Sequence, residues 1–206
     1  MQISIDEGRS AVEGARETLD SHVTGRKSKL APWRGRVFSE LRGVFVTINR
    51  ADRGPDKLRG CIGFPYPVKP LGDAIREATV AAATEDPRFP PVTEGELGSV
   101  VLEVSILTKP EPLAAPKPQD RPSKVRIGID GLIVSRFGFS GLLLPQVATE
   151  YGMDQMEFLS QACLKAGLPP DNWLDKETEI QTFQAEIFEE TTPRGKVVSA
   201  VHQGRR

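Results

Sequence analysis

The spacing of apolar positions along the chain predicts where its helices lie. Ser4, followed three residues later by Glu7, matches the pattern of a helix-capping box. Apolar residues then recur at helical spacing and indicate a first helix with one buried face: Val12, Ala15, Leu19 and Val23. We expect this helix to end before residue 25, because the segment 25–36 lacks such periodicity.

Two further helices are predicted. One opens at Pro70, since proline suits a first helical position, and stops near Asp86, since a residue before proline disfavours helix. Its apolar face carries Leu71, Ile75, Ala78 and Ala82. The other starts near Asp154 and stops at Gly167. Its predicted buried face carries Met156, Leu159, Cys163 and Ala166.

Strands are predicted where apolar positions alternate or β-branched residues gather. Residues 44–48 and 58–63 fit this description, and turn residues at 52–56 join them in a hairpin. Residues 100–107 form the clearest strand, and its second face carries a charged side chain, Glu103. The first face of that strand is apolar throughout: Val100, Leu102, Val104 and Ile106.

The second half of the chain predicts more hairpin structure. Asp130-Gly131 is a strong signal for a two-residue turn, here between 126–129 and 132–137. Residues 138–141 are predicted to form another turn, and 178–190 a single final strand.

Helices interspersed with hairpins, without a regular βαβ rhythm, predict an α+β fold. We expect a mainly antiparallel β-sheet flanked by α-helices. A proline-rich stretch at 109–122 favours an extended crossing between two lobes of a single domain, residues 1–206. The basic, polar residues 192–206 are expected to form a mobile tail.

Composition excludes several classes of function. The chain has 206 residues and a net charge of −1, so its overall charge does not favour binding to nucleic acid or to a membrane surface. It contains no apolar run of about 20 residues, the length that a membrane-spanning helix needs. The acidic, polar N-terminus does not resemble a signal peptide. The two cysteines, Cys61 and Cys163, form no metal-type spacing, and nucleotide-binding motifs are missing. We assign no metal and no cofactor, and we expect a reduced, cytoplasmic protein.

The segment 58–63, LRGCIG, is the strongest chemical signal. In a strand, residues i and i+2 share a face, so Arg59 and Cys61 are predicted to point the same way. Leu58, Ile62 and Phe64 are then predicted to face the core. A guanidinium beside a thiol favours the reactive thiolate, and the two glycines leave room for a ligand or another backbone.

Two interpretations of Cys61 stay open at this level. It is either a small, inert side chain in a tight sheet, or a nucleophile activated by Arg59. A nucleophile needs a base, and neither His22 nor His202 has suitable neighbours. Glu103 and Asp86 are alternative proton acceptors, although ion pairs are the commoner use of such residues. Cys163 is expected in the core.

A basic loop over 26–36, with Trp33 embedded, offers a separate possibility of RNA binding. Acidic residues balance these charges overall, so a solvated surface is the favoured interpretation.

The chain resembles the AMMECR-one domain family, whose hallmark is LRGCIG. The likeness runs from Gly43 to about Glu190 and rests on several motifs in order. Besides LRGCIG they are Pro70-Leu71 with Ala74-Ile75, DPRFPP at 86–91, EVSILT at 103–108, GIDGL at 128–132, LPQVA at 144–148, Phe158-Leu159 and CLKAGL at 163–168.

This resemblance implies an α+β protein with a larger and a smaller lobe and a groove near LRGCIG, where Arg59, Cys61, Asp86, Arg88 and Phe89 gather. It implies no particular reaction. Similar prokaryotic domains accompany, or are fused with, Memo-like and radical-SAM proteins, which suggests these as partners.

The leading hypothesis is an enzyme or enzyme accessory with Cys61 and Arg59 as catalytic residues. Asp86, Arg88, Phe89 and Glu103 are the candidate ligand-binding residues, and Arg59 or Arg88 holds an anionic group. The alternative hypothesis is a non-catalytic adaptor that binds a protein segment or nucleic acid.

Overall fold

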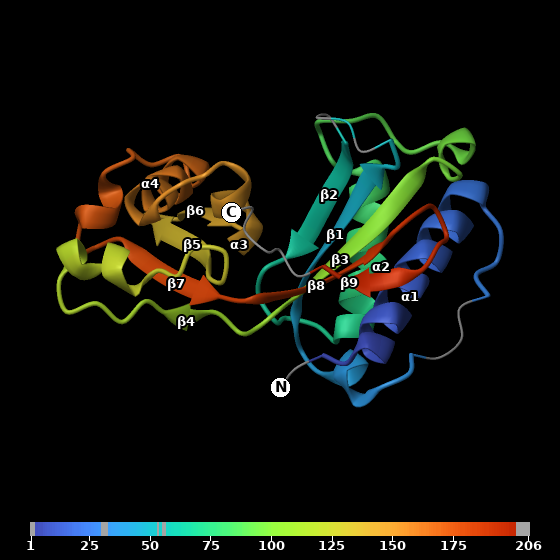
Figure 1. Cartoon of the computed structure of the whole chain (residues 1–206), viewed down its shortest axis with the longest axis horizontal. Helices are drawn as coiled ribbons and strands as arrows, with labels where there is room; N and C mark the ends of the chain where they lie inside the picture. The colour runs from blue at the N-terminus through green and yellow to red at the C-terminus, as the bar shows by residue number, and fades with distance from the viewer. Residues whose placement is uncertain (1–2, 30–32, 53, 55–56, 201–206) are drawn as a thin grey trace. The chain divides into compact units, whose positions relative to one another are not determined.

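The computed structural model describes residues 3–29, 33–52, 54 and 57–200. These residues divide into two compact units: the first holds the chain up to Leu107 and returns from Glu186 onward, and the second holds residues 108–185. Each unit contains helices and its own antiparallel sheet (Figure 1). The α+β fold class is therefore confirmed.

The sheet of the first unit has five strands in the order β2-β1-β3-β8-β9. In chain order they are β1 (Gly43–Arg50), β2 (Leu58–Phe64), β3 (Val100–Leu107), β8 (Ala185–Glu190) and β9 (Val197–Ser199). The predicted hairpin is present, because β1 pairs antiparallel with β2, and β1 also pairs antiparallel with β3. The strand β2, formed by LRGCIG and Phe64, therefore lies at an edge of the sheet.

Two helices cover one face of this sheet. Helix α1 (Ile5–Thr24) carries the predicted capping box of Ser4 and Glu7 and ends at Gly25, whose φ of 67° is left-handed. Helix α2 (Leu71–Thr84) follows Pro70. Their predicted apolar faces pack with the apolar faces of β1 and β3 in one core. Short 3-10 helices, η1 (Arg36–Ser39) and η2 (Glu94–Glu96), complete the unit among the described residues.

The second unit has a four-stranded sheet in the order β4-β7-β5-β6. Its strands are β4 (Glu111–Pro112), β5 (Gly131–Arg136), β6 (Phe139–Leu143) and β7 (Glu179–Phe183). Its helices are α3 (Pro145–Glu150) and α4 (Gln155–Lys165), with 3-10 helices η3 (Pro118–Asp120), η4 (Pro122–Lys124) and η5 (Asn172–Leu174). Cys163 is fully buried in its core, as expected. Met156, predicted beside it, is exposed instead.

The predicted turn at Asp130-Gly131 is wrong. The buried Asp130 carboxylate accepts hydrogen bonds from the backbone and the guanidinium of Arg126, which coils residues 126–130 into an irregular turn. The tight hairpin lies at Phe137-Gly138, where both φ angles are positive (51° and 83°). A two-residue β-hairpin turn of this kind needs positive φ at both positions.

The predicted final strand over 178–190 is two strands. It breaks at Gln184, so that β7 lies in one sheet and β8 in the other. Thr108 and Gln184 hold this break: the N–H of Thr108 donates to the Gln184 carbonyl, and the N–H of Gln184 donates to Thr108 Oγ1. Alternation alone does not show which sheet a residue joins.

Two segments expected to be irregular contain regular structure. The proline-rich stretch at 109–122 forms β4, which pairs with β7, and the start of two 3-10 helices. The expected mobile tail contains β9, which pairs with β8. The remaining tail residues, 201–206, lie outside the described residues.

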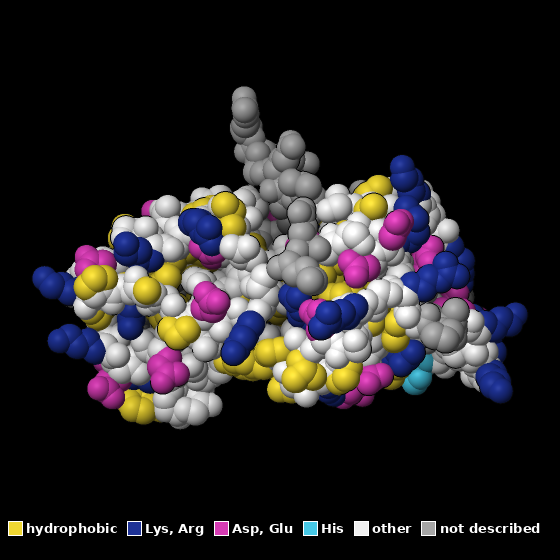
Figure 2. Space-filling model, turned by 90° about the horizontal axis from the view of Figure 1, so that it is seen from below, with side chains coloured by type: hydrophobic (Ala, Val, Ile, Leu, Met, Phe, Trp, Pro, Cys, Tyr) yellow, Lys and Arg dark blue, Asp and Glu magenta, His cyan; other side chains and the backbone are white. Residues whose placement is uncertain are grey.

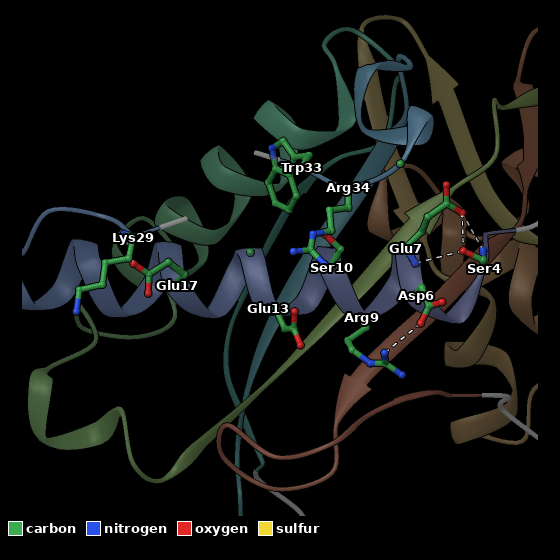
Figure 3. Close-up of a pocket in the computed structure, with 12 residues that line it drawn as sticks. Ser4, Asp6, Glu7, Arg9, Ser10, Glu13, Glu17, Lys29, Trp33 and Arg34 are labelled. Atoms are coloured by element: carbon green, nitrogen blue, oxygen red, sulfur yellow. Dashed lines mark hydrogen bonds and ion pairs between the residues drawn. The ribbon is translucent and has the colours of Figure 1, made fainter. Parts of the chain in front are cut away.

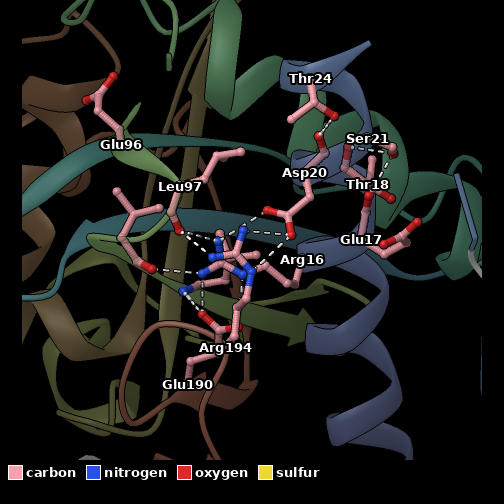
Figure 4. Close-up of polar contacts among 12 residues, drawn as sticks. Arg16, Glu17, Thr18, Asp20, Ser21, Thr24, Glu96, Leu97, Glu190 and Arg194 are labelled. Atoms are coloured by element: carbon pink, nitrogen blue, oxygen red, sulfur yellow. Dashed lines mark hydrogen bonds and ion pairs between the residues drawn. The ribbon is translucent and has the colours of Figure 1, made fainter. Parts of the chain in front are cut away.

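A buried ionic network ties α1 to β3 and β8 (Figure 4). Arg16 donates to both carboxylate oxygens of Glu190, at 3.0 and 2.5 Å, and to the Val100 carbonyl. Glu190 also accepts the backbone N–H of Leu102 at 3.0 Å. Arg194 donates beside it to Asp20. Helix α1 and strand β8 are thereby joined to β3, the central strand of the sheet.

We predict that Glu190→Gln lowers the free energy of unfolding by about 3 kcal/mol, because it leaves the buried Arg16 charge uncompensated. Urea denaturation followed by circular dichroism measures the change. Asp6→Asn is the matched control, since its pair with Arg9 is exposed and contributes at most about 1 kcal/mol. Equal effects of the two substitutions would contradict the prediction.

Candidate functional site

The candidate site begins with a row of polar side chains across three strands. In the register of the sheet, Cys61 of β2 lies opposite Thr47 of β1, and Thr47 lies opposite Glu103 of β3. The Thr47 hydroxyl donates to Cys61 Sγ at 3.2 Å. Thr47 and Glu103 are buried, and Cys61 is half-buried. A thiol, a hydroxyl and a carboxylate are therefore neighbours on one sheet face.

The strand register corrects the predicted position of Arg59. Gly60 pairs with Ile48, whereas Leu58 pairs with Asn49, so Arg59 is an extra residue at a β-bulge. Strict alternation therefore does not continue past Gly60, and the reasoning that placed Arg59 on the face of Cys61 does not hold. Leu58 was predicted to face the core, but it does not belong to the core of the first unit.

The other two residues that were predicted to face the core do so. Ile62 and Phe64, which lie beyond the bulge, pack against the core of the first unit.

The charge of Arg59 is occupied by Glu96. Arg59 Nε donates to Glu96 Oε1 at 2.6 Å, and Nη2 donates to Oε2 and to the Pro91 carbonyl, each at 3.2 Å. This ion pair lowers the pKa of Glu96 to about 2. Arg59 Nη1 is buried and has no hydrogen-bond partner in the described part of the chain.

Glu96 was missed by the sequence analysis, although a signal for it exists. Thr93 and Glu96 have the spacing of a capping box, and the structure forms that box. In this box the Glu96 carboxylate accepts the backbone N–H of Thr93. The same carboxylate binds Arg59.

Asp86 connects the loop after α2 to the edge of the sheet. Its Oδ2 accepts the backbone N–H of Cys61 at 2.8 Å, and the carboxylate also accepts the backbone N–H, Nε and Nη2 of Arg88. Hydrogen bonding by Arg88 is the main reason that the pKa of Asp86 falls to about 2. Because β2 is an edge strand, the Asp86 carboxylate satisfies the backbone N–H of Cys61 that a further strand would otherwise bind.

Phe89 follows in the same loop and lies near two cations. The guanidinium carbon of Arg59 is 5.9 Å from its ring centre, and that of Arg88 is 5.5 Å away. Both distances are in the range of cation–π attraction. Phe89 therefore links the two arginines, which otherwise bind different carboxylates.

The electrostatic setting of Cys61 differs from the prediction. Burial raises the pKa of the thiol; the Thr47 hydrogen bond and the charge of Arg88 oppose this, while the charges of Glu103 and Asp86 add to it. Arg59 is not among these influences. The guanidinium of Arg59, which was predicted to promote the thiolate, binds Glu96 in the structure.

The predicted site residues accordingly form two groups. Asp86, Arg88 and Glu103 lie near Cys61 and act on its thiol, whereas Arg59 binds Glu96 and, like Arg88, lies against the ring of Phe89. Thr47 was missed, although it is the single polar residue within the predicted strand 44–48.

The described residues contain neither a metal-type cluster nor a membrane-spanning helix. Within them, no group of three or more His, Cys, Asp and Glu side chains is arranged to hold a metal ion. Within them too, none of the helices is long and apolar enough to cross a membrane. His202 lies outside this part of the chain.

A hollow of about 930 Å³ lies beside the outer face of α1, away from Cys61 (Figure 3). It includes Lys29, Trp33 and Arg34 from the predicted basic loop, of which residues 30–32 lie outside the described residues. Glu17 accepts hydrogen bonds from Arg26 and from the backbone of Lys29. The walls are of mixed charge, so RNA binding here stays a prediction.

The fold and the site define a two-unit α+β protein with a half-buried thiol at a sheet edge. The chain belongs to the AMMECR1 family, whose model matches residues 12–188. The match begins well before Gly43, where the motif likeness began.

Relatives of known sequence and structure agree with this assignment. A protein of Methanothermobacter thermautotrophicus is 53% identical over 91% of this chain and 96% of its own length. Protein MJ0810 of Methanocaldococcus jannaschii is 49% identical over 95% and 96%. The crystal structure of the uncharacterised protein PH0010 from Pyrococcus horikoshii matches with a TM-score of 0.92 and 46% identity, covering 98% of this chain and 100% of that one.

We predict that Asp86 makes stability depend on pH below about pH 4. A lowered pKa means that its contribution is complete above the ordinary Asp pKa of 3.8 and is lost as the pH falls through about 2. The difference in unfolding free energy between the wild type and Asp86→Asn should shrink by about 2 kcal/mol across this range. Urea titrations between about pH 5 and pH 2 measure it.

Asp73→Asn is the control for this experiment, because its pair with Arg76 is exposed. A difference between wild type and Asp86→Asn that stays constant with pH would show that Asp86 is not held as an anion in the folded state.

Proposed function

We propose that this protein is an enzyme, or an accessory of one, with its site centred on Cys61. The observation that carries the proposal is the shared carboxylate of Asp86, which binds both the backbone of Cys61 and the guanidinium of Arg88. A thiol and a cation are thereby fixed to one anchor. Such a cluster supports nucleophilic chemistry on a ligand that carries an anionic group.

Arg88 is the better candidate than Arg59 for holding that anionic group. The Arg88 side chain is 52% exposed, whereas that of Arg59 is 4% exposed. Arg88 also acts on the thiol through its charge. A catalytic role for Arg59 stays a prediction. Its contacts with Glu96 and with Phe89 favour a structural role, in which Arg59 holds the loop that carries Phe89.

The partner part of the proposal rests on association. Family members accompany Memo-like and radical-SAM proteins, and we propose that this protein works with such proteins in the cytoplasm. The two cysteines are unpaired, which is consistent with a reducing compartment.

Alkylating reagents of different charge test the role of Arg88. Iodoacetate is an anion and iodoacetamide is neutral, so the ratio of their rates at Cys61 reports the local field. We predict that Arg88→Gln lowers the iodoacetate-to-iodoacetamide ratio by about threefold to tenfold at low salt, with a smaller change at high salt. Peptide-level mass spectrometry gives both rates.

The ratio is informative because a change in thiol pKa alters both rates together. Arg9→Gln is the matched control, since Arg9 also pairs with a nearby aspartate but lies on α1. The fully buried Cys163 serves as an internal thiol that should not react in folded protein. An unchanged ratio in Arg88→Gln would refute the anion-binding role.

A specific surface favours the alternative, a non-catalytic adaptor. The segments flanking the end of β2 expose three apolar side chains: Leu41 at 57%, Tyr66 at 40% and Val68 at 67%. Exposed apolar residues that gather in one place are typical of protein-binding surfaces. The isolated bridge between Leu41 and Pro70 brings these segments together.

The adaptor hypothesis predicts that Val68→Glu weakens binding to a purified Memo-like protein at least about tenfold, because it places a charge in a desolvated contact. Titration calorimetry measures the dissociation constant, with Cys61→Ser as the comparison. Under the adaptor hypothesis Cys61→Ser binds normally and retains cellular function. Loss of cellular function in Cys61→Ser with binding intact would reject the adaptor hypothesis in favour of chemistry.

A further inference from the structure

Thr47 holds a special place in the row across the sheet. The backbone N–H of Cys61 donates to Asp86, so it is not used for pairing with β1. Thr47 and Cys61 therefore form a non-hydrogen-bonded pair, the kind in which opposite side chains lie closest in an antiparallel sheet. This geometry explains the 3.2 Å separation of Thr47 Oγ1 and Cys61 Sγ.

We propose that Thr47 is the positioning residue of the site, holding the Cys61 sulfur in place and stabilising its thiolate by donating a hydrogen bond to it. The inference rests on the proposed function, because it assigns the group that prepares Cys61 for reaction. Thr47 acts through Cys61 and does not itself contact a ligand.

The surroundings of Cys61 leave this task to Thr47. From the loop after α2, Asp86 opposes ionisation of the thiol, and Arg88, although favourable, already binds Asp86. From β3, Glu103 also opposes ionisation. On β1, the Thr47 hydroxyl is the uncharged group that favours the ionised sulfur.

The residue type fits the role. Threonine is β-branched, and its χ1 angle is restricted, so a buried threonine in an interior strand such as β1 keeps its hydroxyl in one direction. Valine has the same shape without the hydroxyl, and serine keeps the hydroxyl without the second branch. These two substitutions therefore separate packing from hydrogen bonding.

The reaction with iodoacetamide provides the readout. The thiol first loses its proton to water, and the thiolate then forms a bond to the reagent carbon while iodide leaves with the electron pair of the broken bond. The rate as a function of pH follows the thiolate fraction of Cys61. Peptide-level mass spectrometry again identifies the reacting cysteine.

We predict that Thr47→Val shifts this pH–rate profile to higher pH and slows alkylation about tenfold near neutral pH, since a hydrogen bond to a charged group is lost. Thr47→Ser should restore the rate to within about threefold of wild type. Glu103→Gln should shift the profile the opposite way and speed alkylation, because it removes an opposing charge.

Thr79→Val is the matched control, because it removes another buried threonine hydroxyl, in α2, whose bond goes to the Ile75 carbonyl. It should leave the Cys61 profile unchanged even if the protein is less stable. Circular dichroism confirms folding of each variant. An unshifted profile in Thr47→Val, or equal shifts in Thr47→Val and Thr47→Ser, would overturn the proposal.

The outcome is separable from that of the proposed function. A shifted profile in Thr47→Val supports the positioning role, whatever the charge ratio measured for Arg88→Gln. A charge ratio that changes while the Thr47→Val profile stays fixed supports anion binding and refutes positioning by Thr47.

Discussion

The structure depends on one recurring interaction, a carboxylate that accepts both a backbone N–H and an arginine. Asp86 accepts from Cys61 and Arg88, and Glu190 accepts from Leu102 and Arg16. Glu96, which is half-buried, accepts from Thr93 and Arg59, whereas Asp130 accepts both bonds from one residue, Arg126. A buried carboxylate is costly unless it is paired and hydrogen-bonded, so Asp86 and Glu190 each fix two residues relative to each other. In this way a sheet edge, a strand start and two loops acquire defined positions.

The sequence shows this interaction where its members are close along the chain. Arg88 lies two residues from Asp86, and capping patterns predict the starts of α1 and α4. The pair of Arg16 and Glu190 spans 174 residues, and no local pattern indicates it. The prediction at Asp130 failed although the partner is near, because the carboxylate binds Arg126, four residues away, and the expected hairpin turn does not form. The prediction at Gln184 failed because one alternating pattern serves two sheets. Helices with caps follow from local chemistry, whereas sheet membership depends on distant partners.

The sequence named several residues of the candidate site but not their arrangement, and it missed Thr47 and Glu96. Asp86, Arg88 and Glu103 lie near Cys61, yet Arg59 is diverted to Glu96 by a bulge that the strand pattern does not reveal. The result is a thiol under opposing influences. Burial and two carboxylates raise the pKa of the thiol, while a hydroxyl and a guanidinium act to lower it.

The glycines of LRGCIG complete the physical meaning of the motif. A Cβ atom at Gly60 would overlap the backbone carbonyl of Ala82, so the last turn of α2 approaches β2 only because this residue is glycine. This close approach fixes the position of the end of α2. Asp86 follows the helix end and accepts the backbone N–H of Cys61. Gly63 likewise leaves space for the backbone of Val44 and the ring of Phe45. The motif therefore specifies a close helix–strand contact that delivers Asp86 and Arg88 to the thiol. Arg59, the arginine of the motif, binds Glu96 and thereby holds the turn before β3 in place.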